Sequence, residues 1–241
     1  MNHKTKRIGI IFRQFGVLTG IRVLLAEVAR RLFEPWLIPS YSQTGEDRLI
    51  VAMLGDVGQG FYVDVGCNRP QYWSNTFGLY GKGWSGVCID ASPELIDQHK
   101  RLRIRDSSVC AVISNVEQLI EFTEFENSCV SSVSPAHVEE WRSQSRIKRV
   151  RQVRAVSLTS VLEACNTPRS FELLSIDVEG HDFEVLCSID LSLHRPTMIV
   201  IEMHGFDLRT PTDSKIYNYL IENQYKLVGF AMMNGYFRFC G

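Results

Sequence analysis

Four short apolar runs, each with an acidic residue among its last two positions, limit the possible folds of this chain more than any other feature. The runs cover Gly60–Val65, Trp84–Asp90, Phe171–Asp177 and Thr197–Met203. Helix-like segments lie between or after them, at Pro93–Leu102, Thr159–Ala164, Asp182–Cys187 and Lys215–Glu222. Strands that alternate with helices pair in parallel through right-handed crossovers. The sequence therefore predicts an α/β fold around a mostly parallel sheet.

Residues 115–157 interrupt this alternation. Ser108–Ile113, just before them, is apolar and is expected to be a further strand. The interrupting segment contains a strand-like, a helical and a second strand-like stretch, at Leu119–Phe125, Pro135–Ser145 and Val150–Val156. We expect this β-containing insertion to lie over the sheet, where it could contribute residues that bind the acceptor.

The C-terminus is expected to close the sheet with a hairpin. Lys226–Ala231 and Tyr236–Phe239 are strand-like, and Asn234–Gly235 between them is a pair that tight turns favour. Such a hairpin places one antiparallel strand in an otherwise parallel sheet.

The totals describe one globular domain with an appended arm. A chain of 241 residues can bury one sizeable core, and a net charge of -1 gives no indication of a nucleic-acid partner. The seven cysteines include no C-x-x-C pair, which argues against a zinc knuckle and favours a reducing compartment. We expect a cytoplasmic protein whose main domain spans residues 39–241.

Residues 1–38 are expected to form a basic, helical arm. The first 33 residues carry seven Lys and Arg residues and one acid, Glu27. Arg13, Gln14 and Arg22 interrupt the apolar stretch too early for a membrane span. The arm could pack on the domain or make peripheral contact with anionic lipid, and the sequence leaves both open.

The first acidic strand end indicates the class of ligand. Ligands of open α/β sheets bind beyond the carboxyl ends of the strands. A dinucleotide fingerprint starting at Gly66 would need glycine at 68 and 71, where the chain has Asn68 and Gln71. Without a phosphate loop, Asp64 and Gly66 suit S-adenosylmethionine, which is cationic and carries no phosphate. Asp90 could accept both ribose hydroxyls, or it could cap the following turn.

An ordered set of motifs resembles the FkbM-type S-adenosylmethionine-dependent methyltransferases. The motifs are YSQTGEDRLI (41–50), FYVDVGCN (61–68), SNT (74–76), GWSGVCIDASP (83–93), VSLTSVL (156–162) and LLSIDVEGHDFEVLCSID (173–190). The resemblance covers about residues 40–205. It implies a Rossmann-like, seven-stranded methyltransferase sheet, mostly parallel.

The resemblance also implies an activity and a cofactor site. Members of this family mostly methylate hydroxyls of sugars or secondary metabolites, which implies a small-molecule or glycan acceptor. Carried over by position, the cofactor S-adenosylmethionine would contact Gln43, Glu46, Asp64, Gly66, Asn68, Asn75, Asp90, Ala91 and Ala111. The alternatives are an NAD-type oxidoreductase, which the missing glycines disfavour, and a non-catalytic interaction domain, which the retained acids disfavour.

The last two acidic strand ends supply the candidate catalytic residues. An alcohol acceptor must lose its proton, so a base is needed within hydrogen-bond reach, or a metal that acidifies the hydroxyl. We expect Asp177 near the reacting methyl group, His181 as the base and Glu202 as an orienting group or second base. An oxygen-rich cluster with one histidine could also hold Mg²⁺ or Mn²⁺, although the spacing does not demand it, and the metal-free site is favoured.

The insertion offers two further candidates. His137 and Trp141 could contact a sugar ring, and the basic run RIKRVRQVR (146–154) could contact an anionic acceptor or form the solvated face of a surface strand.

Overall fold

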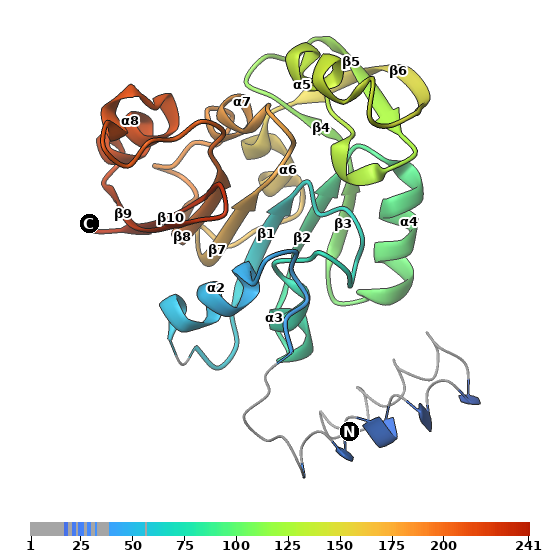
Figure 1. Cartoon of the computed structure of the whole chain (residues 1–241). Helices are drawn as coiled ribbons and strands as arrows, with labels where there is room; N and C mark the ends of the chain where they lie inside the picture. Colours follow the sequence, from blue (N-terminus) through green and yellow to red (C-terminus); the bar gives the residue numbers. More distant parts are fainter. Residues whose placement is uncertain are drawn as a thin grey trace.

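A seven-stranded sheet forms the centre of the computed structural model (Figure 1), which describes residues 39–55 and 57–241 and isolated positions between 17 and 32. The sheet order is β3-β2-β1-β7-β8-β10-β9. Its strands are β1 (Phe61–Val65), β2 (Ser85–Asp90), β3 (Ser107–Cys110), β7 (Ser170–Ile176), β8 (Arg195–Glu202), β9 (Tyr225–Ala231) and β10 (Asn234–Phe239). Among the described strands, β10 is antiparallel to both of its neighbours, β8 and β9, and the pairings from β3 to β8 are parallel. The predicted fold class is confirmed.

Helices cover both faces of this sheet because its central strands are apolar on both sides. The helices are α2 (Glu46–Leu54), α3 (Phe77–Gly81), α4 (Pro93–Leu102), α6 (Leu158–Ala164), α7 (Asp182–Leu186) and α8 (Lys215–Glu222). One buried cluster joins Val63 to α6, α7 and α8. A second cluster joins Tyr62, the preceding residue of β1, to α2, α3 and α4. Successive residues of β1 thus anchor the two layers of helices.

A second, three-stranded sheet of order β4-β6-β5 lies beside the first. It consists of β4 (Val112–Ile113), β5 (Leu119–Phe125) and β6 (Ile147–Val156), with α5 (Pro135–Trp141) between the last two. Figure 1 shows this unit above the ends of β1, β2 and β3. The prediction of a single strand over Ser108–Ile113 is wrong, because this segment divides into β3 and β4, which belong to different sheets. The Ala111 N–H bonds to the Asp90 carbonyl, and the chain then leaves the main sheet to pair Val112 with Ala155.

The closing hairpin has the predicted strands but a different turn. Ala231 pairs with Asn234, so the loop consists of Met232 and Met233. Both residues have positive φ, 48° and 67°, as a two-residue hairpin turn requires. Asn234 and Gly235 instead belong to β10, and a Cβ on Gly235 would lie 2.5 Å from the sulfur of Met203. The glycine serves packing against the strand end, which local turn preference does not reveal.

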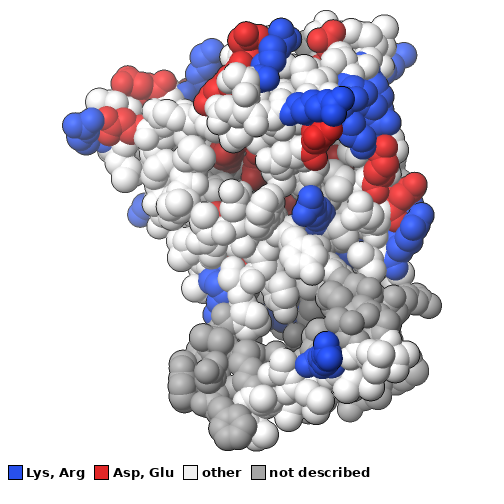
Figure 2. Space-filling model, turned by 45° about the vertical axis from the view of Figure 1, so that its right-hand side comes forward, with Lys and Arg blue, Asp and Glu red and all other residues white. Residues whose placement is uncertain are grey.

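Two features concern the surface and the N-terminus. Figure 2 shows Lys, Arg, Asp and Glu side chains intermingled over the upper part of the molecule, where the insertion lies. Within the described residues, no helix is both long and apolar enough to cross a membrane. The arm expected over residues 1–38 lies almost entirely outside the described residues, and its role stays a prediction.

Candidate functional site

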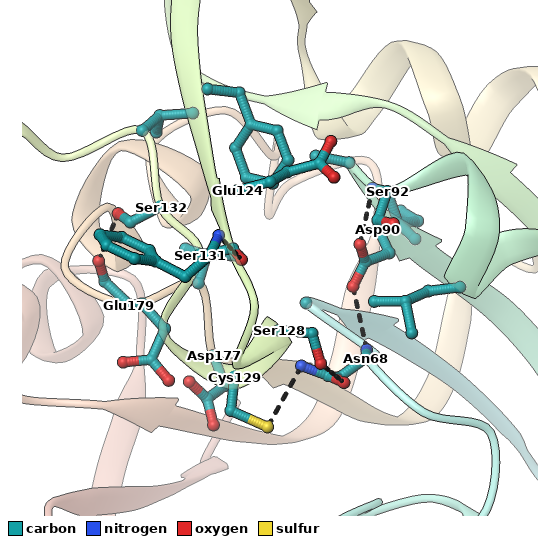
Figure 3. Close-up of a pocket in the computed structure, with 18 of the residues that line it drawn as sticks. Asn68, Asp90, Ser92, Glu124, Ser128, Cys129, Ser131, Ser132, Asp177 and Glu179 are labelled. Atoms are coloured by element: carbon teal, nitrogen blue, oxygen red, sulfur yellow. Dashed lines mark hydrogen bonds between the residues drawn. The ribbon is translucent and has the colours of Figure 1, made fainter. Parts of the chain in front are cut away.

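A cavity of about 300 Å³ opens at the carboxyl ends of the central strands, beneath the insertion. This volume is at the lower end of the range for small-molecule pockets. The predicted site residues that line it are Gln43, Gly66, Asn68, Asp90, Ala91, Ala111, Asp177 and His181. Figure 3 shows Asp90 on one side of the cavity, with Asp177 and Glu179 on the opposite side.

The turn after β1 brings the main chain close to β7. Gly66 has a φ of 80°, and a Cβ built on it would lie 1.7 Å from the carbonyl oxygen of Asp177. The Asp177 N–H donates to the Val65 carbonyl at 3.0 Å, which continues the pairing of β1 with β7. Only glycine fits this position, because both the positive φ and the adjacent backbone exclude a side chain. The structure thus gives Gly66 a packing role against β7, and its predicted contact with the cofactor stays a prediction.

Asp90 fixes the two turns on its side of the cavity. Its Oδ2 accepts the Asn68 N–H at 3.0 Å and its Oδ1 accepts the Ser92 N–H at 2.8 Å. The capping interpretation of Asp90 is therefore correct. Each carboxylate oxygen has a second lone pair, so the same group can also accept from a ligand. Burial raises the pKa of Asp90 to about 6, although the two N–H donors act in the opposite direction.

The opposite side is formed by the turn between β7 and α7. Asp177 and Glu179 would share one strand face only if β7 continued past them, but β7 ends at Ile176. Glu179 instead adopts a left-handed backbone, with φ of 58°. Asp182 holds the turn, because its two oxygens accept the N–H groups of Val178 and Gly180 at 3.0 and 3.1 Å.

The carboxylates of this turn repel one another. Burial raises the pKa of Asp177, and the nearby Asp64 and Glu46 raise it further. Burial also raises the pKa of Glu179, and the nearby carboxylates of Asp177 and Glu202 raise it further. A cation bound here would favour the ionised carboxylates and return these pKa values toward their ordinary range. The electrostatics of the rim therefore favour a positively charged ligand.

Four predicted site residues lie outside the lining of this cavity. Asp64 is buried and accepts the Thr76 hydroxyl at 2.5 Å. Asn75 donates to the Ser175 hydroxyl at 3.1 Å, and Glu46 accepts the N–H of its neighbour Thr44 at 2.9 Å.

Glu202, the fourth, ends β8 and lies 2.8 Å from Nε2 of His204. Oxygens of Asp177, Asp182 and Glu202 lie within 4.8 Å of one another, so the ends of β7 and β8 do share one rim.

His181 directly precedes α7 and lines the cavity. Its Nε2 lies 3.1 Å from the hydroxyl of Ser114, and its Nδ1 lies 3.6 Å from a Glu184 oxygen. Burial lowers its pKa, and the nearby Glu184 opposes this shift. The ring is therefore neutral near pH 7, as a proton acceptor must be.

The insertion contributes a wall that sequence reasoning did not assign. Phe122 and Glu124, on β5, line the cavity, as do residues 128 and 131–133. Arg149 and Arg151 form ion pairs with the buried Glu124, at 2.9 and 2.6 Å. The alternation of Leu119–Phe125 identified the strand but not its inner face, because the cavity forms only after β5 pairs with β6.

The basic run of the insertion is largely paired. Besides the two contacts with Glu124, Arg149 and Lys148 contact Glu94 at 2.7 and 3.5 Å, and Arg146 contacts Glu126 at 3.6 Å. These pairs agree with the interpretation as a surface strand. His137 and Trp141 lie on α5, outside the cavity lining.

Comparison with known proteins identifies the family. A search of curated proteins and a search of solved structures both found no match. The family model described as the methyltransferase FkbM domain matches residues 64–227, more than half of the chain, from the end of β1 into β9. With this match and the seven-stranded sheet, the chain belongs to the FkbM methyltransferase family.

Proposed function

We propose that this methyltransferase uses S-adenosylmethionine to methylate a hydroxyl group of a sugar, a glycan or another small metabolite. One observation carries the proposal: carboxylates occupy both sides of the cavity, with Asp90 facing Asp177 and Glu179. A donor with two ribose hydroxyls and a positively charged methionine end complements this arrangement.

The two sides have separate binding tasks. Asp90 would accept the ribose hydroxyls while it holds its two turns. Ala111, Leu95 and Phe122 form apolar lining near that side, suited to the adenine. Asp177 would lie beside the sulfonium and its methyl group, where the positive charge of the ligand offsets the repulsion of Asp177 by its acidic neighbours.

The chain's main task in the reaction is to position the acceptor. The sulfonium supplies an already activated methyl group, so orientation accounts for much of the rate. His181, neutral near pH 7, would accept the hydroxyl proton, and its contacts with Ser114 and Glu184 hold the ring in place.

A thermal shift experiment tests the cofactor. S-adenosylmethionine and its demethylated product, each at 100 times the dissociation constant, should stabilise the protein by about 2.7 kcal/mol, and NAD should not. A shift with NAD alone, or no shift with either methyl-donor ligand at millimolar concentration, would overturn the assignment.

Labelled cofactor tests the reaction type. Incubation with a panel of sugars and hydroxylated metabolites should place the label on oxygen. Transfer to nitrogen or sulfur alone would contradict O-methylation. Asp177→Asn should lower turnover more than cofactor affinity; the reverse result would move Asp177 into the binding set.

A further inference from the structure

Three residues to which the proposed methyl transfer assigns no chemical step meet beside the cavity. His137 comes from α5 of the insertion, Glu179 from the turn after β7, and His204 from the segment after β8. One potential ligand atom from each lies within 4.8 Å of the others. Only Glu179 lines the cavity, so the cluster borders the site without filling it.

His137 has an unpartnered ring atom in this cluster. The residue is 7% exposed, and its buried Nε2 has no hydrogen-bond partner among the described residues. This atom lies 3.5 Å from Oε2 of Glu179. A buried polar atom without a partner is costly, and an ion is one of the few explanations for it. The capped start of α5, where Ser134 accepts the His137 N–H, holds the histidine in this position.

A carboxylate lies beside the ring of His204. Its Nε2 lies 2.8 Å from Oε2 of Glu202. This contact is an ion-pair distance and not a hydrogen bond, because the buried Oε2 of Glu202 has no hydrogen-bond partner among the described residues.

The backbone that presents Glu179 is strained and supported from the insertion. A left-handed conformation is unfavourable for a residue other than glycine and persists only where the surroundings impose it. The Ser132 hydroxyl donates to the Glu179 carbonyl at 2.7 Å. A Cβ on Gly180 would lie 3.5 Å from Cβ of His137, so α5 packs directly on this turn.

We propose that His137, Glu179 and His204 bind a divalent transition-metal ion such as Zn²⁺. Two imidazoles and one carboxylate suit zinc and related metals, whereas Mg²⁺ prefers oxygen ligands alone. Three protein ligands leave a position for water or a substrate oxygen, as in catalytic zinc sites. A role for that position in holding the acceptor hydroxyl rests on the proposed function, whereas binding of the metal does not.

A neighbouring trio, Asp177, Asp182 and Glu202, is the alternative location. Both oxygens of Asp182 already accept backbone N–H groups. In the trio of His137, Glu179 and His204, by contrast, Nε2 of His137 has no hydrogen-bond partner among the described residues. This difference favours the two histidines and Glu179 as the primary ligands.

Zinc binding to the full chain tests the proposal. The background carries Cys110→Ser and Cys240→Ser, because these are the exposed thiols of the described residues. After treatment with a chelator and dialysis, Zn²⁺ titration should show one ion per chain. His204→Ala and Glu179→Gln should each weaken binding at least about tenfold. Glu184→Gln, a carboxylate on the same segment, and His181→Asn, a nearby histidine, should leave the affinity unchanged.

The outcomes separate this inference from the proposed function. His204 is 46% exposed at its side chain, so its replacement should preserve the fold, and circular dichroism checks this. Failure to bind Zn²⁺ at micromolar concentration, or loss of binding in Asp182→Asn with retention in His204→Ala, would overturn the metal site. Neither result depends on S-adenosylmethionine, whose thermal shift is measured separately on the same proteins.

Discussion

The two sides of the cavity are held together by different interactions. On the side of the main sheet, the donors are backbone N–H groups: those of Gly66 and Cys67 both donate to the Ile89 carbonyl, at 2.9 and 3.1 Å. On the insertion side, the donors are side-chain hydroxyls. The Ser132 hydroxyl donates to the Glu179 carbonyl, and the Ser128 hydroxyl donates to Oδ1 of Asn68 at 3.1 Å.

This difference shows which part of the site can vary. Backbone contacts at Gly66 admit no side chain, so that half of the cavity requires a particular chain path. Contacts through serine hydroxyls can be exchanged one at a time at a modest cost. We expect substitutions on the main-sheet side to damage the fold or cofactor binding, and substitutions on the insertion side to have smaller effects.

The largest effect is expected for Gly66→Ala. The new Cβ would overlap the Asp177 carbonyl, and the positive φ adds strain, so the free energy of unfolding should fall by more than about 4 kcal/mol. Denaturant unfolding measures this. Gly81→Ala is the matched control, because no atom lies within 4 Å of its Cβ position, and its stability should stay within about 1 kcal/mol of the wild type. Equal stability of the two variants would remove the contrast between rigid and variable sides.

The pH dependence of stability should reveal the burial of Asp90. Its folded pKa of about 6 exceeds the ordinary value of 3.8, so the folded state binds the proton more tightly. Protonated Asp90 therefore contributes about 3 kcal/mol to the free energy of unfolding below about pH 4. This contribution is lost as the pH rises to 6. Asp90→Asn should remove this loss, as denaturant unfolding of both proteins between pH 3.5 and 7 would show. A difference between them that does not change with pH would contradict the assignment.

Affinity for the cofactor should also distinguish the two sides of the cavity, with a smaller effect. Asp90→Ala removes a charged hydrogen-bond acceptor, and S-adenosylmethionine should bind at least about tenfold more weakly. Ser128→Ala, on the insertion side, should change the affinity by less than about threefold. Isothermal titration calorimetry measures both, with Asp97→Asn as a control, because that side chain is 61% exposed on α4. Unchanged affinity in Asp90→Ala would leave Asp90 as a turn cap alone.

The smallest effect is expected for Ser132→Ala. Loss of the bond to the Glu179 carbonyl should lower the free energy of unfolding by about 1 kcal/mol. Ser143→Ala, an exposed position in the turn after α5, should be neutral. A loss of several kcal/mol in Ser132→Ala would show that the insertion is as intolerant as the main-sheet side.

Sequence patterns were reliable where the determinant is local. The bounds predicted for α4, α8 and β5 agree with the structure, because helix starts and strand alternation lie in neighbouring residues. Where the predicted bounds were wrong, the cause was a contact with residues far away in the sequence or in another element. Ser108–Ile113 divides at Ala111 because β6, some forty residues later, pairs with its second half. The hairpin turn lies at Met232–Met233 because Gly235 is needed for packing beneath Met203.

The same distinction holds within the site. The motifs identified Asp90, Asp177 and His181 as lining residues, because a residue at a strand end faces the ligand edge of a parallel sheet. They did not indicate that Arg103, which is fully buried, would bond to Thr76, the partner of Asp64. Arg103 and Thr76 lie 27 positions apart and meet only through folding.

The sequence alone determined the parallel sheet, its acidic strand ends and the glycine at the first turn, because polarity and backbone freedom are properties of single residues and their neighbours. Tertiary structure alone decided that Glu124 faces the cavity and that His137, Glu179 and His204 meet. These residues belong to separate segments, and their distances depend on how the insertion packs on the sheet.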